Sequence, residues 1–350
     1  MTIKHFKIEY DAINSRNIFT NGDTINGRII LEASKKTKIQ SLVFIAKGKA
    51  LVRLVNYYGD IISREDVTDD YFQDKLKYYR IKQDIVKEGE QDGREVIEKG
   101  RHVFPFSFKI PNSRKIPSSF SSIFGQIVHT LKAELKQSKK LRRKAKTHFT
   151  FMGTARGSRL MARQHESVNK NIVLGSGKVT MDVHTRRSGY KQGEVLRVKV
   201  EIQNLSSRSV KAKFVLYEIK TFFGPNRGKI QKHEIQKEKS DAIESQSGQT
   251  TVIKEMIIPR ELSPSILNCS LIRLEYMLKV YLEIPCETDL VVKLPIVIIP
   301  ELSREGSTSG CSRSQTFASR NQPAWMSQSM EPPPSYEESA MYPLYPFGDL

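Results

Sequence analysis

The segments "NGDTINGRIILEASKKTKIQSLVFI", residues 21–45, and "QGEVLRVKVEIQNLSSRSVKAKFVL", residues 192–216, align without a gap at an offset of 171. In this alignment Gly22 falls on Gly193, and an acidic residue follows each glycine. Apolar and polar residues alternate in both segments, which is the period of a half-buried β-strand. A general resemblance between strands explains the alternation but not the coincident glycine–acid pairs. We therefore interpret the sequence as an internal duplication.

The end of a later strand repeats as well. "FSFKIP" ends at Pro111 and "KEMIIP" ends at Pro259, so the offset has fallen to 148. Proline cannot donate a hydrogen bond to a β-ladder, and it suits a strand end. The difference between the two offsets predicts an insertion in the first copy. Its best candidate is the polar stretch 56–101, which we expect to be a long hairpin or loop.

Short segments rich in β-branched and aromatic residues recur along both copies, separated by polar turn signals. These segments are residues 25–33, 39–54, 102–111 and 127–135, then 177–184, 195–205, 210–223, 250–259 and 275–285. The pattern predicts an all-β protein with two tandem immunoglobulin-like β-sandwiches. The predicted domains are residues 1–165, a linker at 166–176, residues 177–300, and a Ser-rich, disordered C-terminal tail at 301–350.

Several classes of protein and site are disfavoured by the sequence. The apolar run at 294–300 is strand-sized, and the N-terminus has no apolar signal segment, so no membrane span or signal peptide is expected. The three cysteines are widely spaced, and the seven histidines are scattered without metal-ligand spacing. "GSGKVT" at 175–180 is not a phosphate loop, because Val179 follows Lys178 where that motif has Ser or Thr, and the earlier glycine is missing. No catalytic residue, metal or cofactor is predicted, and the chain is not expected to be an enzyme.

The formal net charge is +19, and the positive charge is concentrated in one stretch. Between Leu131 and Arg163 there are eleven Lys or Arg residues against the single acid Glu134. Three interpretations stay open: a solvated strand end and loop, a site for anionic phospholipids or phosphorylated receptor tails, and a nucleic-acid site. No aromatic residues interleave the run, which disfavours nucleic acid. The candidate anion-binding residues are Lys139, Lys140, Arg142, Arg143, Lys144 and Lys146.

Near the C-terminus, "EPPPSYEESA" at 331–340 contains a PPxY motif formed by Pro333, Pro334 and Tyr336. Proline fixes φ, so the segment is already extended as a polyproline II helix and loses little entropy on docking. Aromatic grooves of WW domains bind such segments. A second copy, with Pro343 and Tyr345, has Tyr342 in place of the first proline, so we expect it to bind more weakly.

The chain resembles the α-arrestins, the arrestin domain-containing proteins, over about residues 5–300. The matching segments include "TNGDTINGR" at 20–28, "GRHVFPFSFKIP" at 100–111, "PSSFSSIFGQIVHTLKAEL" at 117–135 and "LSPSILNCSLIRLEYMLKVYLEIP" at 262–285. The resemblance implies two arrestin-type sandwiches. It departs after "KAEL", where this chain has the basic "KQSKKLRRKAKTHFTF" instead of a proline- and aromatic-containing stretch.

This resemblance also implies a function. In α-arrestins the PPxY motif recruits HECT-type ubiquitin ligases through their WW domains, and membrane receptors or transporters are the cargo. The expected protein is a cytoplasmic adaptor, peripheral at the plasma membrane and endosomes, that promotes ubiquitination and endocytic sorting. The alternative is a retromer-like sorting scaffold or an anionic-lipid-binding module that recruits no ligase.

Overall fold

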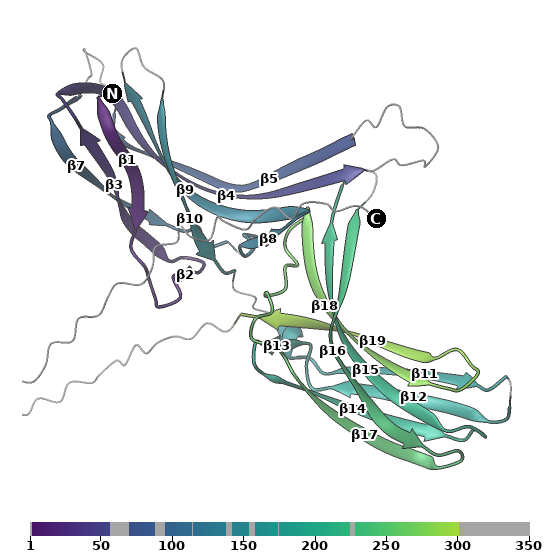
Figure 1. Ribbon diagram of the computed structural model, residues 1–350. Coiled ribbons are helices and arrows are strands. Elements are labelled where there is room, and N and C mark those ends of the chain that lie inside the picture. Colours follow the sequence, from purple (N-terminus) through teal and green to yellow (C-terminus); the bar gives the residue numbers. More distant parts are fainter. Residues whose placement is uncertain are drawn as a thin grey trace, which may run out of the picture. The chain divides into compact units, whose positions relative to one another are not determined.

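The computed structural model describes residues 2–56, 70–87, 95–113, 115–137, 142–153, 158–173, 175–224 and 228–300. Across these ranges the chain forms two β-sandwiches, and the one helical element is the short 3-10 turn η1 (Ser158–Met161) (Figure 1). The prediction of an all-β protein with two tandem sandwiches is confirmed. The C-terminal tail, residues 301–350, lies outside the described residues.

The first sandwich packs a three-stranded sheet against a larger one. The smaller sheet has the order β1 (Ile3–Tyr10), β3 (Thr24–Ala33), β7 (Gly100–Lys109). The larger sheet has the order β2 (Ile18–Phe19), β10 (Arg143–Phe151), β9 (Gly125–Gln137), β4 (Thr37–Asn56), β5 (Asp70–Val86), with β6 (Glu95–Ile97) beside β4 and β8 (Phe120–Ser122) beside β9. Strands β4 and β5 form a long antiparallel hairpin, as expected for part of the insertion at 56–101.

The second sandwich repeats this architecture. One sheet has the order β11 (Gln164–Asn171), β12 (Lys178–Thr185), β14 (Val195–Asn204), β17 (Gly248–Ile257). The other has the order β13 (Gly189–Lys191), β19 (Leu290–Ile299), β18 (Ile272–Glu283), β15 (Val210–Phe222), β16 (Lys229–Ile243). Strands β2 and β13 each pair in parallel with the last strand of their sandwich, so even this exception to the antiparallel pattern is duplicated.

The strand registers support the duplication at the level of single residues. Thr24 of β3 pairs with Lys109, and Val195 of β14 pairs with Ile257. These pairs differ by 171 residues in one partner and by 148 in the other, which are the two offsets seen in the sequence. Thr24 and Val195, and likewise Lys109 and Ile257, therefore occupy equivalent positions in the two sheets.

The turn before β3 and its copy before β14 use the same hydrogen bonds. Gly22 and Gly193 have φ values of +84° and +80°, a conformation that glycine adopts without a Cβ clash. The carboxylates of Asp23 and Glu194 each accept a hydrogen bond from the backbone N–H three residues earlier, at 2.7 and 2.8 Å. The acid after each glycine thus closes the turn, which explains why the pair recurs.

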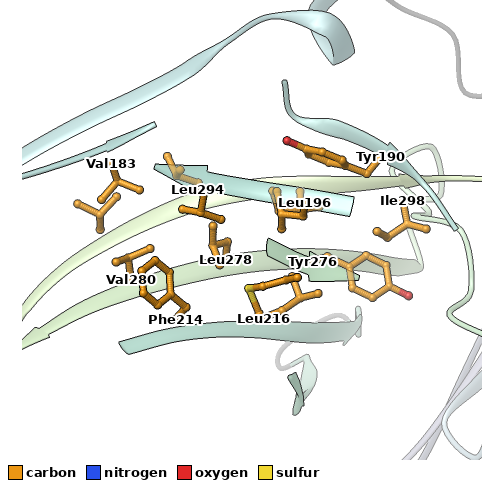
Figure 2. Close-up of a cluster of buried hydrophobic side chains, with 14 of the residues drawn as sticks. Val183, Tyr190, Leu196, Phe214, Leu216, Tyr276, Leu278, Val280, Leu294 and Ile298 are labelled. Atoms are coloured by element: carbon orange, nitrogen blue, oxygen red, sulfur yellow. The ribbon is translucent and has the colours of Figure 1, made fainter. Parts of the chain in front are cut away.

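Each sandwich buries the alternate residues of its strands. In the first, Ile29, Phe44 and Leu131 are inaccessible to solvent. Figure 2 shows the corresponding cluster in the second, where side chains from both sheets meet. Its labelled members are Val183, Tyr190, Leu196, Phe214, Leu216, Tyr276, Leu278, Val280, Leu294 and Ile298.

A polar aromatic residue lies in each core. His129 of β9 is 1% exposed, with Nε2 3.1 Å from the carbonyl oxygen of Pro117 and Nδ1 3.0 Å from the Tyr79 hydroxyl. Burial lowers the pKa of His129 to about 4. In β18 of the second sandwich the buried polar residue is Tyr276, whose hydroxyl donates to the carbonyl oxygen of Ser263 at 2.6 Å. Both groups satisfy their hydrogen bonds inside the protein, as buried polar groups must.

Strand β11 overlaps the linker that the sequence predicted at residues 166–176. Residues Gln164–Asn171 pair with β12 over their whole length, so most of that segment belongs to a sheet of the second sandwich. The predicted boundary after residue 165 falls inside this strand. Its letters, "QHESVNKN", are polar because the strand is at an edge and mostly exposed. We propose that the first sandwich ends after Phe151 and the second begins near Gln164.

Candidate functional site

The residues proposed from the sequence as binding sites are only partly described by the structure. The PPxY residues Pro333, Pro334 and Tyr336 and the weaker motif with Pro343 and Tyr345 lie outside the described residues. The same holds for two members of the basic run, which are Lys139 and Lys140. The structure places the other four members: Arg142, Arg143, Lys144 and Lys146.

Strand β10 separates these four residues by alternation. Lys144 and Lys146 are exposed and point away from the core, because Ala145 between them is buried in it. Arg143 is on the other side of the sheet, since it pairs with the buried Leu135. Arg142 precedes the strand and is exposed. The structure therefore brings Lys144 and Lys146 together and sets Arg143 apart from them.

The outward side of the large sheet carries many more cations than the basic run alone. We call the outward-facing side of β5, β4, β9 and β10 the basic face. Across it Lys146 pairs with Lys132, Lys132 pairs with Ile45, and Ile45 pairs with Lys82. The cations of the basic face include Lys47, Lys49, Arg53, Lys75, Lys77, Arg80, Lys82, Lys132, Lys136, Lys144 and Lys146.

Sequence reasoning missed the contribution of β4 and β5 to the basic face. Lys47 and Lys49 alternate with buried small residues in "AKGKA" at 46–50, a pattern that already indicates two lysines on one side of a strand. What the sequence does not provide is the partner strand. The register of the β4–β9 pair brings Lys47 near Lys132, more than eighty residues away in the chain.

The electrostatics of the basic face are dominated by like charge. Lys132 donates a hydrogen bond to Glu134, which lowers the pKa of that carboxyl. Burial lowers the pKa of the Lys47 ammonium, and Lys49, Lys132, Lys75 and Lys146 lower it further. Burial and neighbouring cations also lower the pKa of Lys49. An anion bound at this face would relieve the repulsion, so the arrangement is suited to binding anions.

A second cationic feature lies on the outward side of β11, β12 and β14 in the second sandwich. It is a cavity of about 540 Å³ that the sequence did not predict. The rings of His165 and His184 stack in it with centroids 4.3 Å apart, and His184 Nε2 lies 3.1 Å from a Glu201 carboxylate oxygen. Its cationic lining residues are Arg163, Arg186, Arg197 and Lys199.

No group of three or more His, Cys, Asp or Glu side chains in the described ranges is arranged to hold a metal ion. Cys269 is buried and Cys286 is exposed, and neither forms a disulfide. No helix of the described residues is long and apolar enough to cross a membrane.

Comparison with known proteins gives a consistent result. Residues 6–155 match the family "Arrestin (or S-antigen), N-terminal domain", and residues 175–301 match "Arrestin (or S-antigen), C-terminal domain". The chain is 27% identical over 289 residues to arrestin domain-containing protein 4 of Mus musculus, covering 81% of this chain and 69% of that protein.

Two further relatives match over a similar or larger part of the chain. Identity to arrestin domain-containing protein 17 of Caenorhabditis elegans is 29% over 308 residues, which is 83% of this chain and 70% of that protein. Identity to thioredoxin-interacting protein of Sus scrofa is 23% over 350 residues, or 95% of this chain and 84% of that protein. The similarity in each case spans both sandwiches.

Proposed function

Because the chain belongs to the α-arrestin family, we propose that it is a non-catalytic trafficking adaptor that links membrane-protein cargo to a ubiquitin ligase. The two arrestin domains engage a receptor or transporter. The C-terminal PPxY motif recruits a HECT-type ligase through its WW domains. Ubiquitination and endocytic sorting of the cargo follow, at the cytoplasmic side of the plasma membrane and of endosomes.

The observation that carries this proposal is the presence of a PPxY motif in the same chain as two arrestin domains. In the polyproline II conformation Pro333 and Pro334 fit the aromatic groove of a WW domain, and Tyr336 fills the adjoining pocket. The degenerate motif with Pro343 and Tyr345 adds a weaker contact. One strong motif gives less avidity than two towards a ligase with several WW domains.

The candidate anion-binding residues have a supporting role in this proposal. In the sequence Lys139, Lys140, Arg142 and Arg143 immediately precede Lys144 and Lys146, the two residues of the run that lie on the basic face. Each cation near an anionic surface contributes about 1 kcal/mol to binding. The basic run therefore helps to hold the adaptor where its cargo is.

A titration of a tandem WW fragment against the 320–350 peptide tests ligase recruitment. We expect a dissociation constant on the order of 10–100 μM, because the interface is small. Tyr336→Ala removes the aromatic anchor and most of the binding energy. Phosphorylation of Tyr336 places about two negative charges in the aromatic pocket and also prevents docking.

Tyr345→Ala is the matched control, since it changes the same residue type in the weaker motif. A Tyr336→Ala peptide that binds like the wild type, or a larger loss with Tyr345→Ala, contradicts the choice of motif. In cells, the full-length Tyr336→Ala variant should lose ligase co-precipitation and cargo ubiquitination. A wild-type chain that binds no WW fragment would instead favour the retromer-like scaffold or the lipid-binding module.

A further inference from the structure

We propose that the basic face of the first sandwich docks on the anionic surface of a lipid bilayer, with Lys47, Lys49 and Lys146 at its centre. This proposal deepens the proposed function, because it rests on an adaptor that works at membranes and names the surface by which it is held there. The strand registers, the shortage of carboxylates, and the type and spread of the cations support it.

The strand registers place the central lysines on neighbouring strands. Lys47 and Lys49 lie two residues apart on β4, and Lys132 on β9 pairs with both Ile45 and Lys146. On the other side of β4, Lys49 pairs with Lys77 of β5. Adjacent strands are about 4.8 Å apart, so these ammonium groups belong to one continuous surface.

Few carboxylates compensate this charge. On the basic face Asp84 pairs with Lys82 at 2.8 Å, and Glu134 pairs with Lys132. Lys47, Lys49 and Lys146 form no ion pair with any residue that the structure describes. Their mutual repulsion and the burial of Lys47 and Lys49 lower the pKa of both ammonium groups. A negative surface supplies the missing counter-charge.

Aliphatic side chains lie beneath the lysines. Ile45 is 3% exposed and Leu51 is 3% exposed, although both alternate with residues that face the core. Lysine stems cover apolar surface while the ammonium stays in water, and this accounts for the burial of these two residues. Lys146 is exposed and Lys47 and Lys49 are partly exposed, so a flat partner can reach their charged ends.

The type and spread of the cations favour a bilayer over a phosphorylated peptide. Most of the cations named for the basic face are lysines, and the two arginines among them are Arg53 and Arg80. Lysine acts as a point charge, whereas the guanidinium fork of arginine is preferred for bidentate binding of a single phosphate. The face spans four strands, or about 15 Å, and is wider than one phosphate group. Several lipid headgroups fit this distribution better than one phosphorylated side chain.

Co-sedimentation of the purified full-length chain with vesicles tests the proposal. The probe is a vesicle of phosphatidylserine and phosphatidylcholine at about 3:7, compared with pure phosphatidylcholine at low salt. The triple variant Lys47→Ser, Lys49→Ser, Lys146→Ser should reduce partitioning onto the anionic vesicles about a hundredfold. Wild-type binding to pure phosphatidylcholine should be absent.

The matched control removes the same charge from the second sandwich. Lys211, Lys237 and Lys293 are exposed lysines on β15, β16 and β19, so their replacement by serine tests net charge alone. This control should lower partitioning by no more than about threefold. Thermal melts confirm that both triple variants are folded, and the single exposed substitution Lys146→Glu gives a second reading if the first variant is not.

Three results would overturn the proposal. They are equal losses in the test and control variants, equal binding of the wild type to neutral vesicles, and a test variant that keeps vesicle binding but loses a phosphorylated peptide. The outcome is independent of ligase recruitment. Tyr336→Ala should bind vesicles like the wild type, so a failure of the WW titration and a failure of vesicle binding are distinguishable.

Discussion

The outward faces of the two large sheets both carry lysines, but the neighbours of these lysines differ. In the second sandwich Glu283 accepts from Lys213 and from Lys239, each at 3.0 Å. The Lys232 ammonium lies 3.6 Å from the centre of the Tyr217 ring. On the basic face of the first sandwich, Lys47, Lys49 and Lys146 have no such carboxylate partner among the described residues.

The buried polar residues differ as well. His129 becomes protonated only at acidic pH, because burial lowers its pKa to about 4. Tyr276 stays neutral over the whole physiological range, since burial raises its pKa. Two sandwiches with one topology therefore differ in the chemistry placed on corresponding strands. The comparison of the lysines shows that a lysine-rich strand is not by itself a binding site. Neighbouring carboxylates and aromatic rings decide whether each ammonium group already has a partner within the protein.

The largest expected effect is the acid sensitivity of the first sandwich. The pKa of His129 is about 4 in the folded protein and near 6.5 when unfolded, so the unfolded chain binds more protons between these values. Stability from the neutral imidazole is complete above pH 6.5 and is lost as pH falls towards 4, by about 3 kcal/mol. Denaturant unfolding at pH 7 and pH 4.5 measures this loss.

His129→Gln is the matched variant for this test. Its amide keeps donor and acceptor groups for the Pro117 carbonyl and the Tyr79 hydroxyl but does not titrate. We expect the variant to be less stable at pH 7 and to have a shallower pH dependence between 6.5 and 4. An unchanged slope would show that other groups cause the acid sensitivity.

Tyr217→Ala should have the next largest effect, a loss of about 1–2 kcal/mol in the free energy of unfolding. The ring lies under Lys232 and is 5.5 Å from the Lys279 ammonium, so truncation removes both cation–π contacts and side-chain packing. Tyr217→Phe keeps the ring and should cost much less. Equal losses for the two variants would assign the effect to the hydroxyl and not to the ring.

Glu283→Gln should cost about 0.5–1 kcal/mol, because the carboxylate is partly exposed and solvent screens its two ion pairs. The Lys213 hydrogen bond, followed by that from Lys239, lowers the pKa of Glu283, which is consistent with a favourable interaction. The loss should shrink as salt is added. A loss that does not depend on salt contradicts the electrostatic explanation.

Lys47→Met should have the smallest effect and the opposite sign. The substitution keeps an apolar stem over the sheet and removes a charge that Lys49 and Lys132 repel. We expect stability to rise by no more than about 0.5 kcal/mol. A clear loss of stability on thermal melting would mean that the Lys47 charge has a structural role, and would weaken the contrast with Glu283.

The sequence was sufficient for the strands that alternate apolar and polar residues and for the duplication. Strands β3, β14 and β15 bury mainly one face, so their periodicity is visible in the residues themselves. Strand β16 was missed because "KIQKHEIQKEKSDAI" is mostly exposed on both faces at a sheet edge. Strand prediction depends on the alternation of apolar and polar residues, which arises where one face of a strand is buried. An edge strand that is exposed on both faces shows little of this alternation.

The residues of the candidate site were also only partly predictable from the sequence. The run from Lys139 to Lys146 was found because its charges are adjacent in sequence. The lysines of β4 and β5 were not, because only strand pairing brings Lys49 near Lys77 and Lys47 near Lys132. The separation of Arg143 from Lys144 also depends on knowing that the run is a strand.

The edge positions of β5 and β16 have a consequence for solution behaviour. Among the residues that the structure describes, no strand pairs with the outer edge of β5 or of β16, and such an edge is a template for pairing with a second molecule. Both strands are rich in lysine, for example Lys75 and Lys77 on β5 and Lys237 and Lys239 on β16, so like edges repel one another. Added salt screens this repulsion within about 8 Å at physiological strength and over shorter distances above it. Buffers of high ionic strength, commonly used to strip nucleic acid from basic proteins, are therefore expected to promote edge-to-edge self-association and aggregation of this one.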